Sequence, residues 1–182
     1  SAESADQVHV MSELDAATLG RYLHDGRRRI RVVDNGVDCE KFRPLAAGPT
    51  TAPSVLFVGS FGHTPNRDAI GWLFSEIWPR IRAERPDARL QVVGAHAPPE
   101  ILAADGRDGI EVVGTVPDTA AYYRDARVLL APVRAGSGTR LKILEAFASG
   151  VPVVTTRLGA EGIAAQDGEH LLTAESAPEL AA

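Results

Sequence analysis

The chain has 182 residues, which is enough for one complete domain and part of another. It is 45% hydrophobic with a net charge of −5, so it can bury a core but lacks the basic excess that general nucleic-acid binding requires. Its single cysteine, Cys39, excludes a disulfide framework and a cysteine-rich metal site, and no run approaches the roughly 20 apolar residues of a membrane span.

The first part of the chain has the pattern of a strand, a helix and a second strand. Residues 7–11 (QVHVM) predict a strand, residues 15–23 a helix, and residues 30–34 another strand. Asn35-Gly36 follows directly and is a strong turn signal. We interpret residues 1–38 as the remnant of a first domain.

A stretch rich in proline, glycine and threonine, RPLAAGPTTAPS at residues 43–54, is typical of a linker. We therefore place a linker at residues 39–53 and a second domain at residues 54–182. The final residues, APELAA, reach the point at which a helix is expected to begin, so this domain is predicted to be truncated at its C-terminus.

The second domain alternates short apolar runs with helical patterns. The runs are β-branched and apolar at consecutive positions, which is typical of strands buried on both faces of a parallel sheet: 55–59, 90–94, 110–114, 128–132 and 151–156. Strand and helix in alternation predict the α/β class, with a doubly wound parallel sheet of Rossmann-like architecture.

Two of the expected helices are clearly marked. One carries an apolar stripe from Ala69 to Ile81, which Pro79 should kink or restart. Trp72 falls off this stripe and is expected at the surface or at an interface. The second helix is predicted over 139–149 and ends at Gly150, a residue well suited to terminate it.

Ligands of open parallel sheets bind beyond the carboxyl ends of the strands, so the loops that follow the strands are the candidate sites. The first such loop is GSFGHTPN, residues 59–66. Its glycines let the backbone approach a ligand, and the helix start behind it offers unpaired N–H groups to an anion. The spacing makes no dinucleotide fingerprint, and a tight turn between strand and helix is the competing interpretation.

The richest segment follows the run at 128–132. There GSGT, residues 136–139, leads into a helix whose first turn carries Arg140 and Lys142. The helix dipole disfavours cations at this end, and a bound diphosphate would reverse that penalty. Glu145 lies among apolar neighbours and needs a partner, for which ribose hydroxyls or a nearby arginine would serve. The Walker spacing is missing, and the histidines are too scattered to suggest a metal site.

Six segments in chain order resemble the sugar-donor-binding domain of glycosyltransferase family 4 (group 1), the C-terminal half of a GT-B fold enzyme. They are VVDNGVDCEKFRP, FVGSF followed by PN, EVVGTVPD, KILEAFASGVPVVTT, GAEGI and DGEH. The resemblance runs from about Ala5 to the end of the chain. It implies two facing Rossmann-like domains with the active site between them, a nucleotide-sugar donor held mainly by this domain, and transfer with retention and without a metal. The acceptor would be bound by the N-terminal domain.

Matched onto this chain, Glu145 resembles the family's second glutamate, which contacts the ribose of the sugar donor. Gly59 and Ser60 would lie beneath the phosphates, and Val116 beside the base. The loop that would contact the sugar and the diphosphate through backbone amides comprises Ser137, Gly138, Thr139 and Arg140.

The chain departs from the family's pattern at two places. Ser137 occupies the position of the family's first glutamate, eight residues before the second. Where relatives commonly carry an arginine and a downstream lysine after the first strand, this chain has Asn66 and Arg67. We therefore assign stabilisation of the departing diphosphate to Arg140, Lys142, Arg67 and the amides at the helix ends.

Two other functions share parts of this pattern. A GT-B epimerase acting on nucleotide sugars would use the same cleft, but it usually needs acidic and histidine residues at the sugar, which the loop at 136–140 does not supply. A flavodoxin-like regulatory module also alternates strands and helices. It requires acidic residues after its first strand and a phosphorylatable aspartate after a middle strand, whereas here the strands end in glycine or proline.

We expect a nucleotide-sugar donor as the ligand, with no cofactor, no metal and no nucleic acid. Abundant alanine and arginine hint at a bacterial source, and we expect a cytoplasmic location, peripheral to the inner membrane face in a longer protein. The strands at 7–11 and 30–34 would present open edges, so they are expected to fray or to pair with a second copy. The chain alone is expected to bind a nucleoside diphosphate weakly and to transfer no sugar.

Overall fold

The computed structural model describes residues 6–23, 29–44 and 53–182. The first part contains β1 (Val8–Val10), α1 (Glu13–Gly20) and β2 (Ile30–Val32), as the sequence predicts, and β1 and β2 pair in parallel with each other. Helix α1 begins two residues before its predicted start because Ser12 caps it, with its side chain accepting a hydrogen bond from the Asp15 amide.

The second part is built on a six-stranded sheet in the order β5-β4-β3-β6-β7-β8, and every neighbouring pair is parallel. Its strands are β3 (Ser54–Val58), β4 (Arg89–Val93), β5 (Ile110–Gly114), β6 (Val128–Ala131), β7 (Val153–Thr155) and β8 (Leu172–Thr173). The chain moves outward from β3 to β5, then returns to β6 beside β3 and moves outward again. This order confirms the doubly wound fold class. Strand β8 was not predicted, because two residues carry no periodicity.

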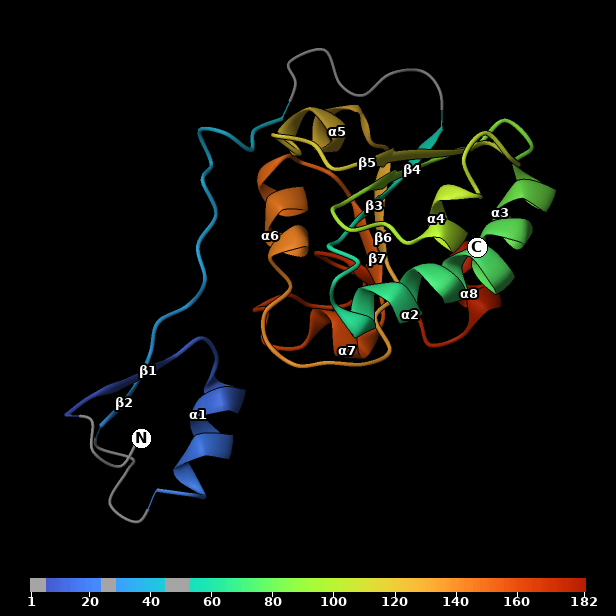
Figure 1. The fold of residues 1–182 in the computed structure, drawn as a ribbon. Coiled ribbons are helices and arrows are strands. Elements are labelled where there is room, and N and C mark those ends of the chain that lie inside the picture. The colour runs from blue at the N-terminus through green and yellow to red at the C-terminus, as the bar shows by residue number, and fades with distance from the viewer. Residues whose placement is uncertain (1–5, 24–28, 45–52) are drawn as a thin grey trace.

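Helices cover both faces of the sheet (Figure 1). One face carries α2 (Thr64–Trp72), the π-helical turn η3 (Leu73–Ile77), α3 (Trp78–Glu84), α4 (Pro99–Leu102) and α8 (Ala177–Ala181). The other face carries α5 (Ala120–Asp125) and α6 (Leu141–Ala148), and α7 (Arg157–Ala160) follows β7. The helix expected at the end of the chain is α8, and Ser176 and Glu179 form its capping box.

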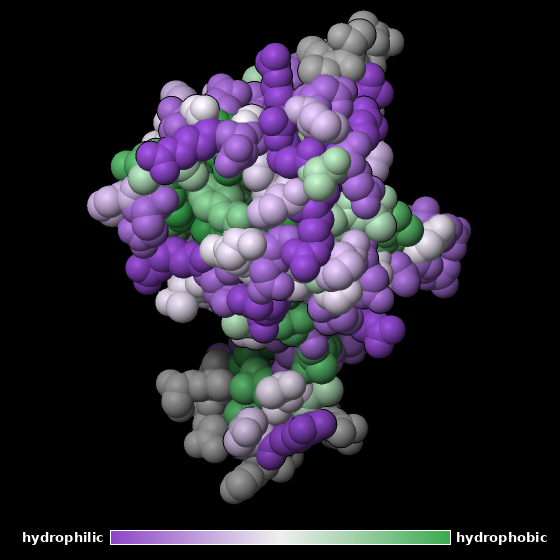
Figure 2. All heavy atoms as spheres, turned by 90° about the vertical axis from the view of Figure 1, so that its right-hand side faces the viewer, coloured by the Kyte–Doolittle hydropathy of each residue, from purple (hydrophilic) through white to green (hydrophobic). Residues whose placement is uncertain are grey.

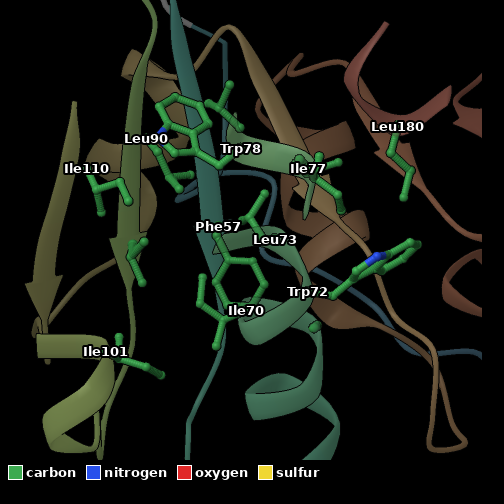
Figure 3. Packing of buried hydrophobic residues seen from close by; sticks show 14 of the residues in the cluster. Phe57, Ile70, Trp72, Leu73, Ile77, Trp78, Leu90, Ile101, Ile110 and Leu180 are labelled. Carbon is green, nitrogen blue, oxygen red and sulfur yellow. The ribbon is translucent and has the colours of Figure 1, made fainter. Parts of the chain in front are cut away.

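Each face of the sheet has its own buried cluster. Side chains alternate along β3, so that Val55 and Phe57 enter one cluster and Leu56 enters the other. Figure 3 shows Ile70 and Leu73 packing over Phe57 in the first cluster. Burial on both faces explains why the strands are apolar at consecutive positions.

The long helix with the apolar stripe is present, with an irregularity just before Pro79. The chain forms η3 there and resumes as α3, in which Pro79 lies in the first turn. Proline lacks the N–H for an α-helical bond and clashes with the carbonyl four residues earlier, and the wider turn avoids both problems. The surface position expected for Trp72 was wrong. Trp72 is 7% exposed, and the Arg134 guanidinium lies 4.6 Å from its ring centre.

The segment that leaves β2 packs against the second part of the chain. Phe42 is buried and meets the Tyr123 ring edge-on, with 5.6 Å between the ring centres. Lys41 forms an ion pair of 3.0 Å with Asp118, and Pro44 lies against Gly150. Residues 41–44 are therefore fixed to the face that carries α5 and α6, while the rest of the predicted linker, 45–52, lies outside the described residues.

Candidate functional site

The strand order places a topological switch between β3 and β6. These strands are neighbours, but the chain visits β4 and β5 between them, and the helices that follow, α2 and α6, cover opposite faces. In open parallel sheets, ligands commonly bind in a crevice at such a point, beyond the carboxyl ends of the strands. Both predicted ligand loops, 59–66 and 136–140, start at these two ends, on the edge that faces the N-terminal segment (Figure 1).

Asn66 joins the first loop to the start of α6. Its Nδ2 donates a hydrogen bond of 2.9 Å to the Ser60 carbonyl, and its Oδ1 accepts one of 3.0 Å from Lys142 Nζ on α6. Gly59 is required beneath this arrangement, since a Cβ there would lie 2.8 Å from the Asn66 side chain. The structure thus brings together four of the predicted site residues, Gly59, Ser60, Asn66 and Lys142.

The loop after β6 approaches α2 at a second point. Gly136 has a φ of +97°, and a Cβ there would lie 3.0 Å from Pro65 Cγ. A residue other than glycine would therefore be both strained and crowded. Ser137 and Gly138 are exposed beyond this contact. The Thr139 hydroxyl oxygen is buried without a hydrogen-bond partner among the described residues.

Lys142 is a partly buried cation. Its Nζ lies 5.1 Å from the centre of the Phe57 ring, under the Asn66 side chain. Burial, and then the charge of Arg140, lower the pKa of Lys142 to about 8, while Glu145 acts in the opposite direction. An ammonium group has three donors, and within the described part of the chain its hydrogen-bond partner is the Asn66 oxygen. An anion in the crevice would supply both charge and acceptors.

Arg140 lies differently from the prediction. Helix α6 begins at Leu141 and not at residue 139, so Arg140 is its N-cap residue and not part of its first turn. Its Nη2 donates to the Gly136 carbonyl at 3.1 Å, and its Nη1 donates to the Gly138 carbonyl. Burial lowers the pKa of Arg140, and Glu161 opposes this shift. The guanidinium therefore braces the loop from within, next to the position expected for a diphosphate.

The helices that begin at the switch point, α2 and α6, have no side-chain cap at their N-termini. By contrast, Ser12, Thr156 and Ser176 cap α1, α7 and α8. An uncapped helix start presents the positive end of the helix dipole to an anion, together with any N–H groups that have no partner. At α2, Pro65 has no N–H and the Asn66 amide donates to the His63 carbonyl, so this helix offers mainly its dipole. Helices α4 and α5 also lack a side-chain cap.

Glu145 has a partner that the sequence did not predict. Its Oε2 accepts a hydrogen bond of 2.7 Å from the hydroxyl of Tyr123, on α5. Tyr123 is fully buried, as expected of a core residue. No spacing signal links two residues on separate helices, so only the packing of α5 against α6 reveals this pair.

The remaining predicted residues lie at the margins. Arg67 is exposed in the first turn of α2, next to Asn66. Val116 lies in the loop between β5 and α5 and packs against the cluster that contains Tyr123. Sequence reasoning missed the ion pair of Arg134 with Asp68 of α2, at 2.7 Å, which braces the start of the loop after β6. These two residues are 66 positions apart, and nothing in the sequence pairs them.

A cavity of about 670 Å³ lies where the N-terminal segment meets this edge. Met11, Ser12 and Asn35 line it on one side, and Thr139 and Phe147 on the other. Figure 2 shows apolar residues gathered at this junction, below a mainly hydrophilic face.

Two features are absent from the described part of the chain. Residues 6–23, 29–44 and 53–182 contain no group of three His, Cys, Asp or Glu side chains that could hold a metal ion. None of the helices in these ranges is long and apolar enough to span a membrane.

Comparison with known proteins agrees with this architecture. The family model described as "Glycosyl transferases group 1" matches residues 52–182. The lipopolysaccharide core biosynthesis mannosyltransferase LpcC of Rhizobium leguminosarum is 30% identical over 168 residues, covering 79% of this chain and 47% of the relative. The phosphatidyl-myo-inositol mannosyltransferase of Mycobacterium tuberculosis is 29% identical over 159 residues, covering 82% of this chain and 41% of the relative. The chain thus spans less than half the length of these relatives.

Solved structures share the fold at low sequence identity. TarM superposes with a TM-score of 0.79 at 15% identity, over 99% of this chain and 36% of that protein. HepE of Anabaena, in complex with UDP-glucose, superposes with a TM-score of 0.74 at 15% identity, over 99% of this chain and 53% of that one. At these identities the likeness shows the fold alone.

Proposed function

Because the chain belongs to the group 1 glycosyl transferases and has the fold of a GT-B C-terminal domain, we propose that it is the sugar-donor-binding half of a glycosyltransferase. The enzyme would transfer a sugar from a nucleoside-diphosphate sugar to an acceptor. One observation carries the proposal: Asn66 and Lys142 join the loop after β3 to the start of α6 at the switch point of the sheet. Narrower membership of glycosyltransferase family 4 stays a prediction.

The diphosphate is assigned to the crevice between these loops. When the sugar bond breaks, negative charge develops on the departing diphosphate, and cations and N–H groups already in place stabilise it most effectively. Lys142 and the uncapped start of α6 provide such groups, and Arg67 lies in the first turn of α2, next to Asn66. Arg140 contributes by fixing the loop carbonyls and through its own charge.

The other parts of the sugar donor follow from this placement. Glu145, in the second turn of α6, is assigned to the ribose hydroxyls. Val116 is assigned to the base. Ser137, Gly138 and Thr139 are assigned to the sugar and diphosphate, since Ser137 and Gly138 are exposed and all three residues have backbone N–H groups that could donate to a ligand. Ser137 replaces the glutamate expected there by family resemblance, so this enzyme would hold the sugar without that carboxylate.

The finer features of the reaction rest on the resemblance to family 4. We propose retention of configuration and metal-independent transfer, in which Lys142 and Arg140 provide the positive charge at the diphosphate. The acceptor would bind on the N-terminal domain, in the cytoplasm or at the inner membrane face. Consequently the present chain should bind the sugar donor without transferring the sugar. Self-association would use the outer edges of the β1–β2 pair, which no other described strand covers.

The test is calorimetric titration of the chain with UDP and GDP and with the two bare nucleosides. We expect at least one diphosphate to bind, and to bind more tightly than its nucleoside, because the crevice is assigned to phosphate. Lys142→Met should remove most of this difference. Lys41→Met is the matched control, since Lys41 is the chain's other lysine and pairs with Asp118 away from the loops. Failure of both diphosphates to bind would overturn the proposal.

A further inference from the structure

The hydroxyl of Tyr123 is the side-chain partner of the Glu145 carboxylate. The hydrogen bond is 2.7 Å long and joins α5 to α6. Within residues 6–23, 29–44 and 53–182, no other side chain hydrogen-bonds this carboxylate. A glutamate side chain has three rotatable bonds, so one fixed oxygen selects among its rotamers.

The Tyr123 ring is itself held in place. It is fully buried, and the Phe42 ring meets it edge-on at an angle of 85°. The start of α5 is fixed by Asp118, which accepts a hydrogen bond of 3.0 Å from the Ala120 amide and pairs with Lys41. The phenol therefore has no room to turn away from Glu145.

The protonation state of the phenol determines the direction of this hydrogen bond, with Tyr123 as the donor and Glu145 as the acceptor. Burial, followed by the nearby charge of Glu145, raises the pKa of Tyr123 far above its ordinary value. At neutral pH the hydroxyl therefore keeps its proton and donates to Oε2. Oε1 and the remaining lone pair of Oε2 stay free to accept hydrogen bonds from a ligand.

We propose that Tyr123 is a positioning residue for recognition of the ribose. It holds the Glu145 carboxylate in one rotamer, so that the two ribose hydroxyls meet an acceptor already in place and little rotamer entropy is lost on binding. This inference rests on the proposed role of Glu145 in ribose binding. It adds a residue that never touches the sugar donor and acts through another.

The experiment uses the nucleoside diphosphate that binds in the titration above and compares it with its 2′,3′-dideoxy analogue, which lacks both ribose hydroxyls. UDP is the first choice, and GDP replaces UDP if only GDP binds. Calorimetry gives the ratio of the two dissociation constants for the chain and for Tyr123→Phe, which removes only the phenol oxygen. We expect the chain to favour UDP by about tenfold or more, and Tyr123→Phe to lower that preference by about three- to tenfold without changing affinity for the analogue. Tyr122→Phe is the matched control and should leave the preference unchanged.

The outcomes separate the inference from the proposed function. If the chain itself shows no preference for UDP over the analogue, the ribose role of Glu145 fails, and the inference fails with it. A second outcome is that the chain shows the preference, that Glu145→Gln removes it, and that Tyr123→Phe keeps it in full. In that case the proposed function stands, and Tyr123 is only a core residue.

A measurement on the unaltered fold covers the case in which Tyr123→Phe does not fold. The three tyrosines can be replaced by 3-fluorotyrosine, and the Tyr123 resonance assigned by ¹⁹F NMR with Tyr22→Phe and Tyr122→Phe. Ribose hydroxyls that bind Glu145 redistribute its charge, so UDP should shift this resonance and the dideoxy analogue should not. Equal shifts with both ligands would overturn the inference.

Discussion

Replacing Lys142 by methionine should stabilise the fold and weaken ligand binding at the same time. The lysine is partly buried, and its pKa is lowered to about 8 from an ordinary value of 10.5. At about 1.4 kcal/mol per pKa unit, carrying the charge in the folded protein costs about 3 kcal/mol. Loss of the charged hydrogen bond to Asn66 offsets about 2 kcal/mol of the gain. We therefore expect Lys142→Met to raise the free energy of unfolding by about 1 kcal/mol at pH 7.

The pH dependence gives this prediction a definite sign. Because the folded-state pKa lies below the unfolded-state value, the penalty is complete below pH 8 and disappears as the pH rises toward 10.5. The stability gain of Lys142→Met should therefore shrink over this interval. Urea unfolding at pH 7, 8.5 and 10 measures it, with Lys41→Met as the control, which should change stability by less than about 1 kcal/mol at each pH because its ion pair is exposed.

Ligand binding completes the test. A charged hydrogen bond to phosphate contributes about 1.5–3 kcal/mol, so Lys142→Met should weaken nucleoside-diphosphate binding by about tenfold or more. A bound diphosphate should also raise the pKa of Lys142, so binding at pH 8 should take up about half a proton, measurable by calorimetry in buffers of different ionisation enthalpy. A variant that is less stable at pH 7, or that binds the diphosphate as tightly as the unaltered chain, would refute this reasoning.

Three other predictions concern the loop, the connecting segment and the chain as a whole. Arg140→Ala should weaken diphosphate binding more than nucleoside binding in calorimetry; equal losses would mean that Arg140 serves only to brace the carbonyls of Gly136 and Gly138. Phe42→Ala should lower the free energy of unfolding in urea by about 3 to 5 kcal/mol, because it empties a buried site against Tyr123, and a loss below about 1 kcal/mol would show that this segment is not docked in solution. The chain should bind a nucleoside diphosphate but transfer no sugar. The assay compares it, in separate reactions, with a longer protein that also contains an N-terminal domain, and comparable transfer by both would show that this chain holds a complete active site.

Local patterns determined most of the architecture. Apolar runs such as 90–94 are typical of strands buried on both faces of a covered parallel sheet, so together with the helical patterns between them they predicted strands, direction and fold class without any contact being known. The candidate loops followed from the same pattern, since ligands of such sheets bind at the carboxyl ends of the strands. The motif around Glu145 was also visible because its residues are consecutive.

Partner choice was decided only by the tertiary structure. Lys142 meets Asn66 across 76 positions, and Tyr123 meets Glu145 across 22. These pairs exist because β6 returns to lie beside β3 and because α5 packs on α6, and periodicity within one segment says nothing about either event. Trp72 was misplaced for the same reason, since Arg134, which lies over its ring, comes from another strand end.

The electrostatic character of the site also depends on the tertiary structure. In the sequence, Arg140 and Lys142 are two residues apart, and each has the same formal charge. In the fold, Arg140 turns back onto the loop carbonyls, whereas Lys142 is directed under Asn66 and loses part of its hydration. A pKa records the free energy of a charge in its surroundings, and those surroundings come from segments far away in the chain. The sequence could therefore name the cations of the site, but only the packing around each of them determines what its charge can do.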